Sequence, residues 1–461
     1  MKTNYFNFKK YNDKVLITND LGYWCLLEVT DFANLVKGNI KPDDAVYSEL
    51  CQKRFIFDEN FFVSVSPTAA ELSNFKNYIR YSTSLHIFVL TNNCNFNCRY
   101  CQAQSENNNN YGYMTKDIAL KAVDIALQSP AHLLSFEMQG GEPLLNFDVM
   151  KEIILYSEKK RGTKEISYTI TTNGSLLSEE ILDFFEKYKV SVSISLDGPR
   201  ELHNYNRPMK NGQDSFEYIK GNVKKLEAKH INGGAVLTST VFSLDKWKEI
   251  VDTYLELGFS DVFIRALTPL GYANEHWNEI GYTVEKYLEY YNHVLDYVIE
   301  LNKTGKRVRE MFSLLFLRKM LSQNSDNYME LRSPCGATIG QIAYFYDGNI
   351  YTCDEGRMIA QMGDDSFCLG NVFESSYSDL VGCNNCQAVC SASILEGLPG
   401  CSDCVYMPYC GVCPATTYAL EGSIFSRTHN NYKCKLHKGI MDSLFERIQD
   451  DEIRKIFISW L

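Results

Sequence analysis

The stretch that decides the fold is LHIFVLTNNCNFNCRYC, residues 85–101. Its first half is mostly apolar and rich in strand-favouring residues, which is typical of a buried strand. Its second half places Cys94, Cys98 and Cys101 on one short loop directly after that strand. Three thiolates on one loop can hold three irons of a cubane iron–sulfur cluster and leave the fourth iron open. The alternative is a structural zinc site, which would need a fourth protein ligand from a distant part of the chain.

Similar strand candidates recur downstream and alternate with helical patterns. Thr115 and Ser178 stand where the N-caps of two such helices are expected. Six strands alternating with helices predict parallel βα units. We therefore expect the α/β fold class, with a (βα)6 partial TIM barrel whose active-site residues lie at the carboxyl ends of the strands. The six candidates are residues 85–90, 133–138, 166–170, 190–196, 235–241 and 262–267.

The chain divides into three predicted domains. Residues 1–80 contain a candidate hairpin followed by two short helices, which favours a small winged-helix-like α+β module that we expect to take part in peptide recognition. Residues 81–310 hold the partial barrel and a helical stretch at 284–303. Residues 311–461 are rich in cysteine, glycine and aromatic residues, which predicts a C-terminal domain with sites of its own.

Composition narrows the class of protein. The net charge of −11 and the pI near 5.4 argue against a non-specific nucleic-acid binder. No run of about 18 uncharged apolar residues occurs, so we expect no membrane span. The opening residues MKTNYF lack the apolar core of a signal peptide, which predicts a cytoplasmic protein. In that reducing compartment the 16 cysteines are poor disulfide candidates and indicate metal or redox work.

The Cys-x3-Cys-x2-Cys loop, with Tyr100 before its last cysteine, resembles the radical S-adenosylmethionine (SAM) superfamily. The resemblance implies a [4Fe–4S] cluster on Cys94, Cys98 and Cys101, with the open iron bound by the amino and carboxylate groups of SAM. It implies that the reduced cluster gives one electron to the sulfonium, which yields methionine and a 5′-deoxyadenosyl radical that takes hydrogen from a substrate. An electron donor such as flavodoxin or ferredoxin is the implied redox partner.

The resemblance also implies a SAM site at the ends of the later strands. Gly140-Gly141-Glu142-Pro143 looks like the GGEP motif of the family, in which glycines allow a close approach to the methionine moiety and Glu142 accepts a hydrogen bond from its ammonium. Ser195 resembles a residue that faces the SAM carboxylate. Arg207 is expected to pair with that carboxylate, and a solvated surface position is the alternative. The implied cofactor-binding residues are Gly140, Gly141, Glu142, Thr172, Asn173, Ser195 and Arg207.

The cysteines after residue 334 resemble the SPASM extension of radical SAM peptide- and protein-modifying enzymes, which holds two auxiliary clusters. A zinc ribbon would explain only residues 401–413. One departure is that two residues, instead of three, separate Cys410 from Cys413. The resemblance implies Cys401, Cys404, Cys410 and Cys434 as ligands of a distal [4Fe–4S] cluster, and Cys335, Cys353 and Cys413 as ligands of a proximal one.

Three further assignments concern residues near these cysteines. Cys368 is the first candidate for the fourth ligand of the proximal cluster, with an open site as the alternative. Cys383, Cys386 and Cys390 have no counterpart in the pattern and are either buried thiols or ligands of something extra. Asp354 follows Cys353 as a catalytic aspartate does in sulfatase-maturating enzymes, which implies a general base. The alternative for Asp354 is a structural carboxylate that binds backbone amides.

The resemblance as a whole implies an enzyme that modifies a ribosomally synthesised precursor peptide. Residues 16–22, 264–271 and 362–365 further resemble the HxsB-type maturases of His-Xaa-Ser peptide systems. The expected reaction is hydrogen abstraction followed by a cross-link or similar oxidative modification, with an auxiliary cluster taking up the electron. One alternative is formylglycine formation, as in anaerobic sulfatase maturation. Another is a non-enzymatic metal-binding module.

Overall fold

The computed structural model describes residues 2–57, 65–104, 112–322, 327–426 and 431–461. Its centre is a nine-stranded sheet in the order β12-β10-β9-β8-β7-β6-β14-β15-β16. The first six strands of that order run parallel, as the sequence predicts. In chain order they are β6 (Leu85–Thr91), β7 (Leu133–Gly140), β8 (Glu165–Thr172), β9 (Ser191–Ser195), β10 (Gly233–Thr238) and β12 (Ile264–Arg265).

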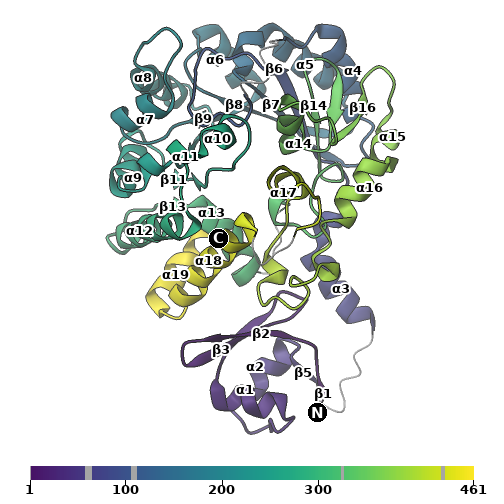
Figure 1. The fold of residues 1–461 in the computed structure, drawn as a ribbon, viewed down its shortest axis with the longest axis vertical. Coiled ribbons are helices and arrows are strands. Elements are labelled where there is room, and N and C mark those ends of the chain that lie inside the picture. The colour runs from purple at the N-terminus through teal and green to yellow at the C-terminus, as the bar shows by residue number, and fades with distance from the viewer. Residues whose placement is uncertain (1, 58–64, 105–111, 323–326, 427–430) are drawn as a thin grey trace.

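Helices connect these strands and cover the outer side of the sheet (Figure 1). The side chains of Thr115 and Ser178 cap α4 and α6 by accepting hydrogen bonds from backbone amides, each at 3.3 Å, which confirms both predicted N-caps. The α/β partial barrel is therefore confirmed. The connecting helices are α4 (Lys116–Ala126), α5 (Phe147–Lys160), α6 (Glu179–Tyr188), α7 (Arg200–Asn206), α8 (Ser215–Ala228) and α9 (Trp247–Glu256).

The apolar run of β6 reflects burial on both of its faces. Phe88 packs on the main core with Phe136 of β7, at 5.0 Å between ring centroids. Ile87 and Val89 point the other way and pack with Ala343. Because both faces are covered, the strand carries apolar residues without the usual polar alternation.

The sheet does not end with the partial barrel. β14 (Gln341–Tyr344) pairs in parallel with β6, and β15 (Asn349–Tyr351) and β16 (Cys368–Asn371) continue the sheet in antiparallel fashion. The segment predicted as a separate C-terminal domain thus adds strands to the barrel sheet. The physical reason is that β6 would otherwise leave one edge of backbone donors and acceptors unpaired.

The N-terminal module is a three-stranded antiparallel sheet with two helices, drawn at the bottom of Figure 1. The sequence predicted β3 (Lys14–Thr18), β4 (Trp24–Glu28), α1 (Val29–Val36) and α2 (Tyr47–Gln52), but not β2 (Asn7–Tyr11). A short pair, β1 (Lys2–Thr3) with β5 (Ile56–Phe57), closes the module. It is joined to the rest of the chain, because Trp24 Nε1 donates to the carbonyl of Met320 at 2.7 Å.

The remaining elements surround the barrel mouth and the cysteine-rich segment. The helix predicted over 284–303 is α12 (Val284–Lys303). No helix in the described part of the chain is long and apolar enough to cross a membrane. The other elements are α3 (Val65–Phe75), η1 (Asn77–Arg80), η2 (Pro143–Asn146), η3 (Val241–Ser243), β11 (Asp261–Val262), α10 (Tyr272–Glu275), α11 (Trp277–Ile280), β13 (Arg309–Glu310), α13 (Met311–Leu317), η4 (Arg318–Ser322), η5 (Met329–Leu331), α14 (Asp354–Gln361), α15 (Tyr377–Gly382), α16 (Asn384–Ser391), η6 (Leu395–Gly397), η7 (Met407–Tyr409), α17 (Pro414–Glu421), α18 (Tyr432–Arg447) and α19 (Asp451–Trp460).

Candidate active site and cysteine groups

Three cysteines on the loop after β6 line a cavity of about 180 Å³ at the carboxyl ends of the parallel strands. The thiols of Cys94, Cys98 and Cys101 share this cavity with polar residues from the ends of β7 to β10. The sequence-predicted residues brought together here are Cys94, Cys98, Cys101, Gly140, Gly141, Thr172, Asn173, Ser195 and Arg207. Parallel strands place their carboxyl ends at one edge of the sheet, which explains how residues so far apart in sequence meet.

Backbone hydrogen bonds hold the cysteine loop in place from two sides. On one side, the amide of Arg99 donates to the carbonyl of Asn206 at 3.0 Å. On the other, the amide of Tyr272 donates to the carbonyls of Cys101, at 3.0 Å, and Gln104, at 2.8 Å. Gly271, just before Tyr272, has a φ of +54°, and a Cβ there would fall 2.4 Å from the carbonyl oxygen of Gln104. Only glycine therefore lets this turn approach the loop so closely.

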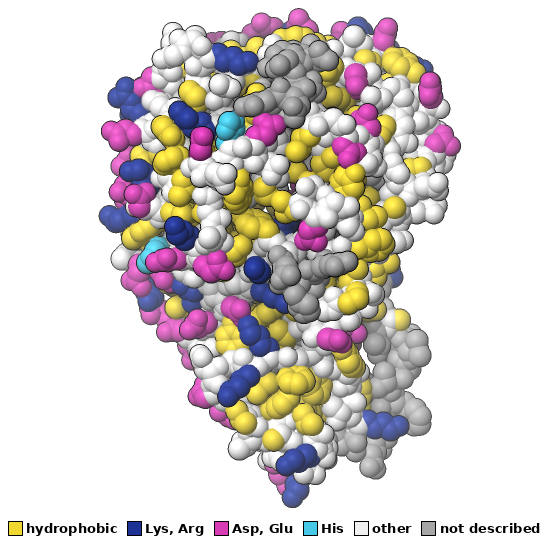
Figure 2. Space-filling view, in the orientation of Figure 1, with side chains coloured by type: hydrophobic (Ala, Val, Ile, Leu, Met, Phe, Trp, Pro, Cys, Tyr) yellow, Lys and Arg dark blue, Asp and Glu magenta, His cyan; other side chains and the backbone are white. Residues whose placement is uncertain are grey.

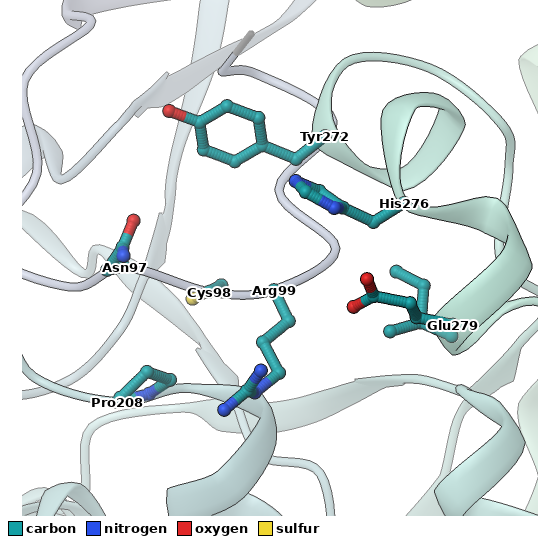
Figure 3. A pocket seen from close by; sticks show the side chains of 8 residues that line it. Asn97, Cys98, Arg99, Pro208, Tyr272, His276 and Glu279 are labelled. Atoms are coloured by element: carbon teal, nitrogen blue, oxygen red, sulfur yellow. The ribbon is translucent and has the colours of Figure 1, made fainter. Parts of the chain in front are cut away.

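The same loop also lines a second cavity, of about 310 Å³ (Figure 3). Tyr272, His276 and Glu279 line one part of it, and the loop contributes Cys98 and Arg99. Cys98 lines both cavities. The loop therefore borders two cavities.

The thiols accept hydrogen bonds from nearby side chains. Asn173 Nδ2 lies 3.8 Å from Cys94 Sγ, and an Nη of Arg207 lies 3.9 Å from Cys98 Sγ. Burial raises the pKa of Cys98 to about 12, although the Arg207 guanidinium partly opposes this. Burial also raises the pKa values of Cys94 and Cys101. The three thiols are thus protonated at neutral pH unless a metal centre draws off their protons.

Arg207 is held by a carboxylate that sequence reasoning did not single out. Asp197, fully buried, accepts hydrogen bonds from Arg207 Nε at 3.0 Å and from the hydroxyl of Tyr100 at 2.6 Å. Arg207 is only 8% exposed, so the alternative of a solvated surface arginine is wrong. The signal for Asp197 was its place in the turn after β9, but nothing local connected it to Tyr100.

Glu142 lies behind the cavity wall. Its carboxylate is buried and accepts hydrogen bonds from the amides of Leu144, at 3.0 Å, and Asn173, at 2.8 Å, and from the hydroxyl of Thr172, at 2.8 Å. Burial raises its pKa to about 7. The structure thus gives Glu142 the role of joining two strand ends, and its predicted contact with the SAM ammonium stays a prediction.

The two glycines of the same motif approach the cysteine loop itself. A Cβ on Gly140 would lie 2.2 Å from the carbonyl oxygen of Thr91, and a Cβ on Gly141 would lie 2.3 Å from that of Asn93. From the sequence, we expect these glycines to allow a close approach to the ligand. The structure shows that they are also needed for the close approach of one backbone loop to another.

The C-terminal cysteines form two groups. The predicted distal ligands line one small cavity, and Lys438 lies beside them; these cysteines are Cys401, Cys404, Cys410 and Cys434. The predicted proximal ligands line a second cavity and are Cys335, Cys353 and Cys413. Cys413 lines both cavities and therefore lies between the two groups. The structure brings each predicted set together, and their ligation of clusters stays a prediction.

Cys368 lies apart from the other predicted proximal ligands. It lies on β16, opposite Tyr351, and packs with the cluster that contains Ile87 instead of the one that contains Cys353. It does not line the proximal cavity. The strand pairing of β16 holds its backbone in the sheet, so the structure does not support Cys368 as the fourth ligand.

The extra cysteines lie on and before α16. Cys383 caps the helix, and its sulfur accepts from the amide of Cys386 at 3.5 Å. Cys386 is buried, and Cys390 lies one turn further along. None of the three is among the residues lining the two C-terminal cavities, within the described part of the chain.

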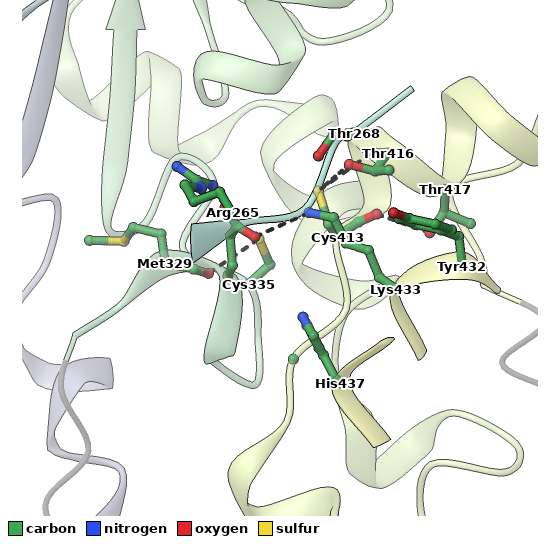
Figure 4. A network of polar contacts seen from close by, with 12 residues as sticks. Arg265, Thr268, Met329, Cys335, Cys413, Thr416, Thr417, Tyr432, Lys433 and His437 are labelled. Atoms are coloured by element: carbon green, nitrogen blue, oxygen red, sulfur yellow. Dashed lines mark hydrogen bonds and ion pairs between the residues drawn. The ribbon is translucent and has the colours of Figure 1, made fainter. Parts of the chain in front are cut away.

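Charged side chains join the barrel to the proximal cysteine group (Figure 4). Glu330 accepts from Arg265 of β12 at 2.7 Å and from Lys433 of α18 at 3.2 Å. Asp354, the predicted base, forms an ion pair with the buried Arg357 one turn along α14. The catalytic role of Asp354 stays a prediction.

Residues 88–257 match the family model described as the radical SAM superfamily. A radical SAM cyclopropyl synthase, TigE, of Paramaledivibacter caminithermalis is 26% identical over 379 residues, which are 78% of this chain and 73% of that one. A cysteine-type anaerobic sulfatase-maturating enzyme of Clostridium perfringens is 25% identical over 374 residues, 79% of this chain and 97% of the enzyme.

Two solved structures share the fold. Native anSMEcpe with bound AdoMet and Kp18Cys peptide has a TM-score of 0.69 at 22% identity, over 80% of this chain and 99% of that one. Streptococcus suis SuiB bound to precursor peptide SuiA has a TM-score of 0.56 at 15% identity, over 92% of this chain and 97% of that one.

The fold and the three-cysteine cavity define a partial barrel with three thiols at the carboxyl ends of its parallel strands. The chain carries a radical SAM domain and is an enzyme of the radical SAM superfamily. A non-enzymatic metal-binding module is thereby excluded. Membership implies SAM and a [4Fe–4S] cluster, and the three-thiol donor set with adjoining polar strand ends fits that pair. Among the described residues, no three Cys, His, Asp or Glu side chains are arranged to hold a single metal ion.

Proposed function

We propose that this chain is a maturase that abstracts hydrogen from a ribosomally synthesised peptide and installs a cross-link or similar oxidative modification. The observation that carries the proposal is the order of three cysteine groups from the barrel mouth into the C-terminal segment, with Cys413 shared by the last two cavities. Support also comes from SuiB, whose structure contains a precursor peptide and covers 92% of this chain.

The residues of the first cavity would bind and orient the cofactor. Cys94, Cys98 and Cys101 would hold the cluster, while Ser195 and Arg207 would face the SAM carboxylate. When bound, cluster and SAM supply a 5′-deoxyadenosyl radical that abstracts hydrogen. Gly140, Gly141, Thr172 and Asn173 would shape the rest of the SAM site, and Glu142 would support it from behind.

The C-terminal groups would complete the oxidation. Forming a new bond from a C–H and an X–H group removes two hydrogens from the peptide. One hydrogen atom leaves with the deoxyadenosyl group, and the second leaves as a proton and an electron. In this proposal Asp354 takes the proton, and two auxiliary [4Fe–4S] clusters on the proximal and distal cysteines accept the electron. A flavodoxin or ferredoxin would supply the electron that starts the cycle.

The N-terminal module would hold the leader of the precursor. β2 and β4 are the edges of its sheet, and an extended peptide can add a strand to such an edge. Phe8 on β2 is 59% exposed and packs against Phe32 with the two rings tilted, at 5.0 Å between ring centroids. Figure 2 shows hydrophobic side chains gathered on the lower part of the molecule, where Figure 1 places this module.

Co-expression with a candidate precursor, followed by mass spectrometry, tests the proposal. We expect the peptide to lose two hydrogens with the wild-type chain and to keep its mass with Cys98→Ala. Phe8→Lys should weaken precursor binding but leave SAM cleavage without peptide intact. If the peptide mass stays unchanged although wild-type enzyme cleaves SAM to 5′-deoxyadenosine, the cross-linking proposal is wrong.

Formylglycine formation is the second candidate. The sulfatase-maturating enzyme of C. perfringens is matched over 97% of its length, and Asp354 directly follows Cys353. This reaction would turn a cysteine or serine of a sulfatase peptide into an aldehyde, which hydrazide labelling detects. An aldehyde product from such a peptide would favour this candidate over cross-linking.

A further inference from the structure

The proximal cysteine group lies in a small cavity that also contains carboxylates. Cys335, Cys353 and Cys413 are 6%, 3% and 7% exposed. Glu330 and Glu355 line the same cavity. A [4Fe–4S] cluster has four irons, so three thiols leave one iron without a protein ligand. The fourth position must be filled by a non-cysteine residue, by a small molecule or by substrate.

The other cysteines of the C-terminal segment that could supply the missing ligand do not line this cavity. Cys368 lies in the β16 strand and outside this cavity, as described above. Cys386 and Cys390 of α16 are not among its lining residues either. Of the described residues that line the cavity, three are cysteines, and the two carboxylates are the other side chains that can bind iron as anions.

Glu330 is already engaged. Its two oxygens accept from Arg265 Nη at 2.7 Å and from Lys433 Nζ at 3.2 Å. A carboxylate held by two cations has its charge balanced and its lone pairs occupied. Glu330 therefore links the barrel to α18. If it bound iron instead, Arg265 and Lys433 would lose these contacts.

Glu355 is in a different situation. It lies in the first turn of α14, two residues after Cys353, which caps that helix. The neighbouring Asp354 pairs with Arg357, whereas the Glu355 carboxylate forms no side-chain hydrogen bond or ion pair in the described part of the chain; Lys433 attracts it, but pairs with Glu330. A carboxylate in a confined cavity is costly unless it is paired or coordinates a metal. The helix turn that fixes Cys353 thus also brings to the three thiols a carboxylate whose oxygens no side chain contacts.

We propose that Glu355 is the fourth protein ligand of the proximal auxiliary cluster. Its carboxylate binds the iron that Cys335, Cys353 and Cys413 leave free. The inference rests on the proposed function, because it requires the auxiliary cluster. A cluster with four protein ligands has no open iron, so it acts by taking up an electron and not by binding the substrate peptide. Exchange of a thiolate for another ligand at one iron also shifts the reduction potential.

The test uses full-length protein purified anaerobically, with saturating SAM so that the open iron of the first cluster is covered. Wild type is compared with Glu355→Ala, Glu355→Gln and Glu355→Cys by iron analysis, EPR and mild ferricyanide oxidation. We expect Glu355→Ala and Glu355→Gln to lose one iron at the proximal site and to give a [3Fe–4S] EPR signal that wild type lacks. Glu355→Cys should keep all four irons but shift the midpoint potential. Asp354→Asn, which changes the adjacent carboxylate, is the matched control and should give the wild-type spectrum.

Two different results would overturn the inference: one shows that Glu355 is not a ligand, and the other shows that the site holds no cluster. If the Glu355 variants and wild type give the same oxidation product and EPR spectrum, Glu355 is not a ligand and the proximal iron is open. If Cys353→Ala leaves the iron content unchanged, no cluster occupies the site and the auxiliary-cluster part of the proposed function fails first. If Cys353→Ala loses about four irons per chain and the Glu355 variants give the expected [3Fe–4S] signal, the results support both the auxiliary cluster and Glu355 as its ligand.

Discussion

Gly271 offers a sharp test of how the cysteine loop is held. The substitution Gly271→Ala places a Cβ 2.4 Å from the carbonyl oxygen of Gln104, 2.6 Å from that of Gln102 and 2.9 Å from that of Cys101. All three are backbone atoms of the cysteine loop or the turn that follows it, so no flexible side chain can move away. The turn and the loop must therefore separate.

The loss of folding stability expected for Gly271→Ala has two contributions. A non-glycine residue at a φ of +54° in this region of the backbone costs about 1–3 kcal/mol. Separating the turn from the loop also breaks the two hydrogen bonds from the Tyr272 amide to Cys101 and Gln104, which contribute about 1 kcal/mol each. The matched control is Gly305→Ala, at a φ of +87° with nothing near its Cβ, which carries the strain without the collision. Gly271→Ala should therefore be less stable than Gly305→Ala by about 2 kcal/mol.

Urea unfolding of both variants, followed anaerobically by circular dichroism, measures that difference. The same samples are analysed for iron and for SAM binding, because a displaced loop should release the first cluster and lose its ligand. We expect Gly305→Ala to keep wild-type iron content and Gly271→Ala to lose about four irons per chain. Equal stability and equal iron content in the two variants would refute the reasoning.

Three further predictions concern other parts of the fold. Cys98→Ala should lower the anaerobic iron content by about four per chain and abolish 5′-deoxyadenosine formation, and a full iron complement would contradict this. Asp197→Asn leaves the buried Arg207 without its charge partner and should cost about 3–5 kcal/mol in urea unfolding, so a loss well below 1 kcal/mol would argue against the pairing. Burial lowers the pKa of His86, which contacts the hydroxyl of Tyr344, to about 3 from 6.5. The folded state thus binds this proton less tightly than the unfolded chain, and stability falls as the pH drops below about 6.5. Between pH 7 and 5 the free energy of unfolding of wild type should fall by about 2 kcal/mol more than that of His86→Gln. An equal pH dependence of the two unfolding free energies would show that His86 does not contribute.

Much of the barrel could be predicted because its signals are local. The order of strands and helices, the N-caps at Thr115 and Ser178, and the helix over 284–303 all appear as periodicity or capping within short windows. β2 was missed because its residues, NFKKY, include two consecutive lysines on an edge strand and carry a weak apolar pattern. The strand predicted over 262–267 is divided between β11, which pairs with β13, and β12, which continues the sheet.

The sequence by itself determined the loop with Cys94, Cys98 and Cys101, because the ligand set for one cluster lies within eight residues of chain and its spacing is enough to recognise it. Only the tertiary structure decided that Cys368 lies away from the proximal group, and that Glu355 lies with it. Those placements depend on how β16 pairs and where α14 begins relative to segments far away in the chain. A cluster ligand is selected by distance in space, and cysteine spacing along the chain reports that distance only while the ligands share one loop.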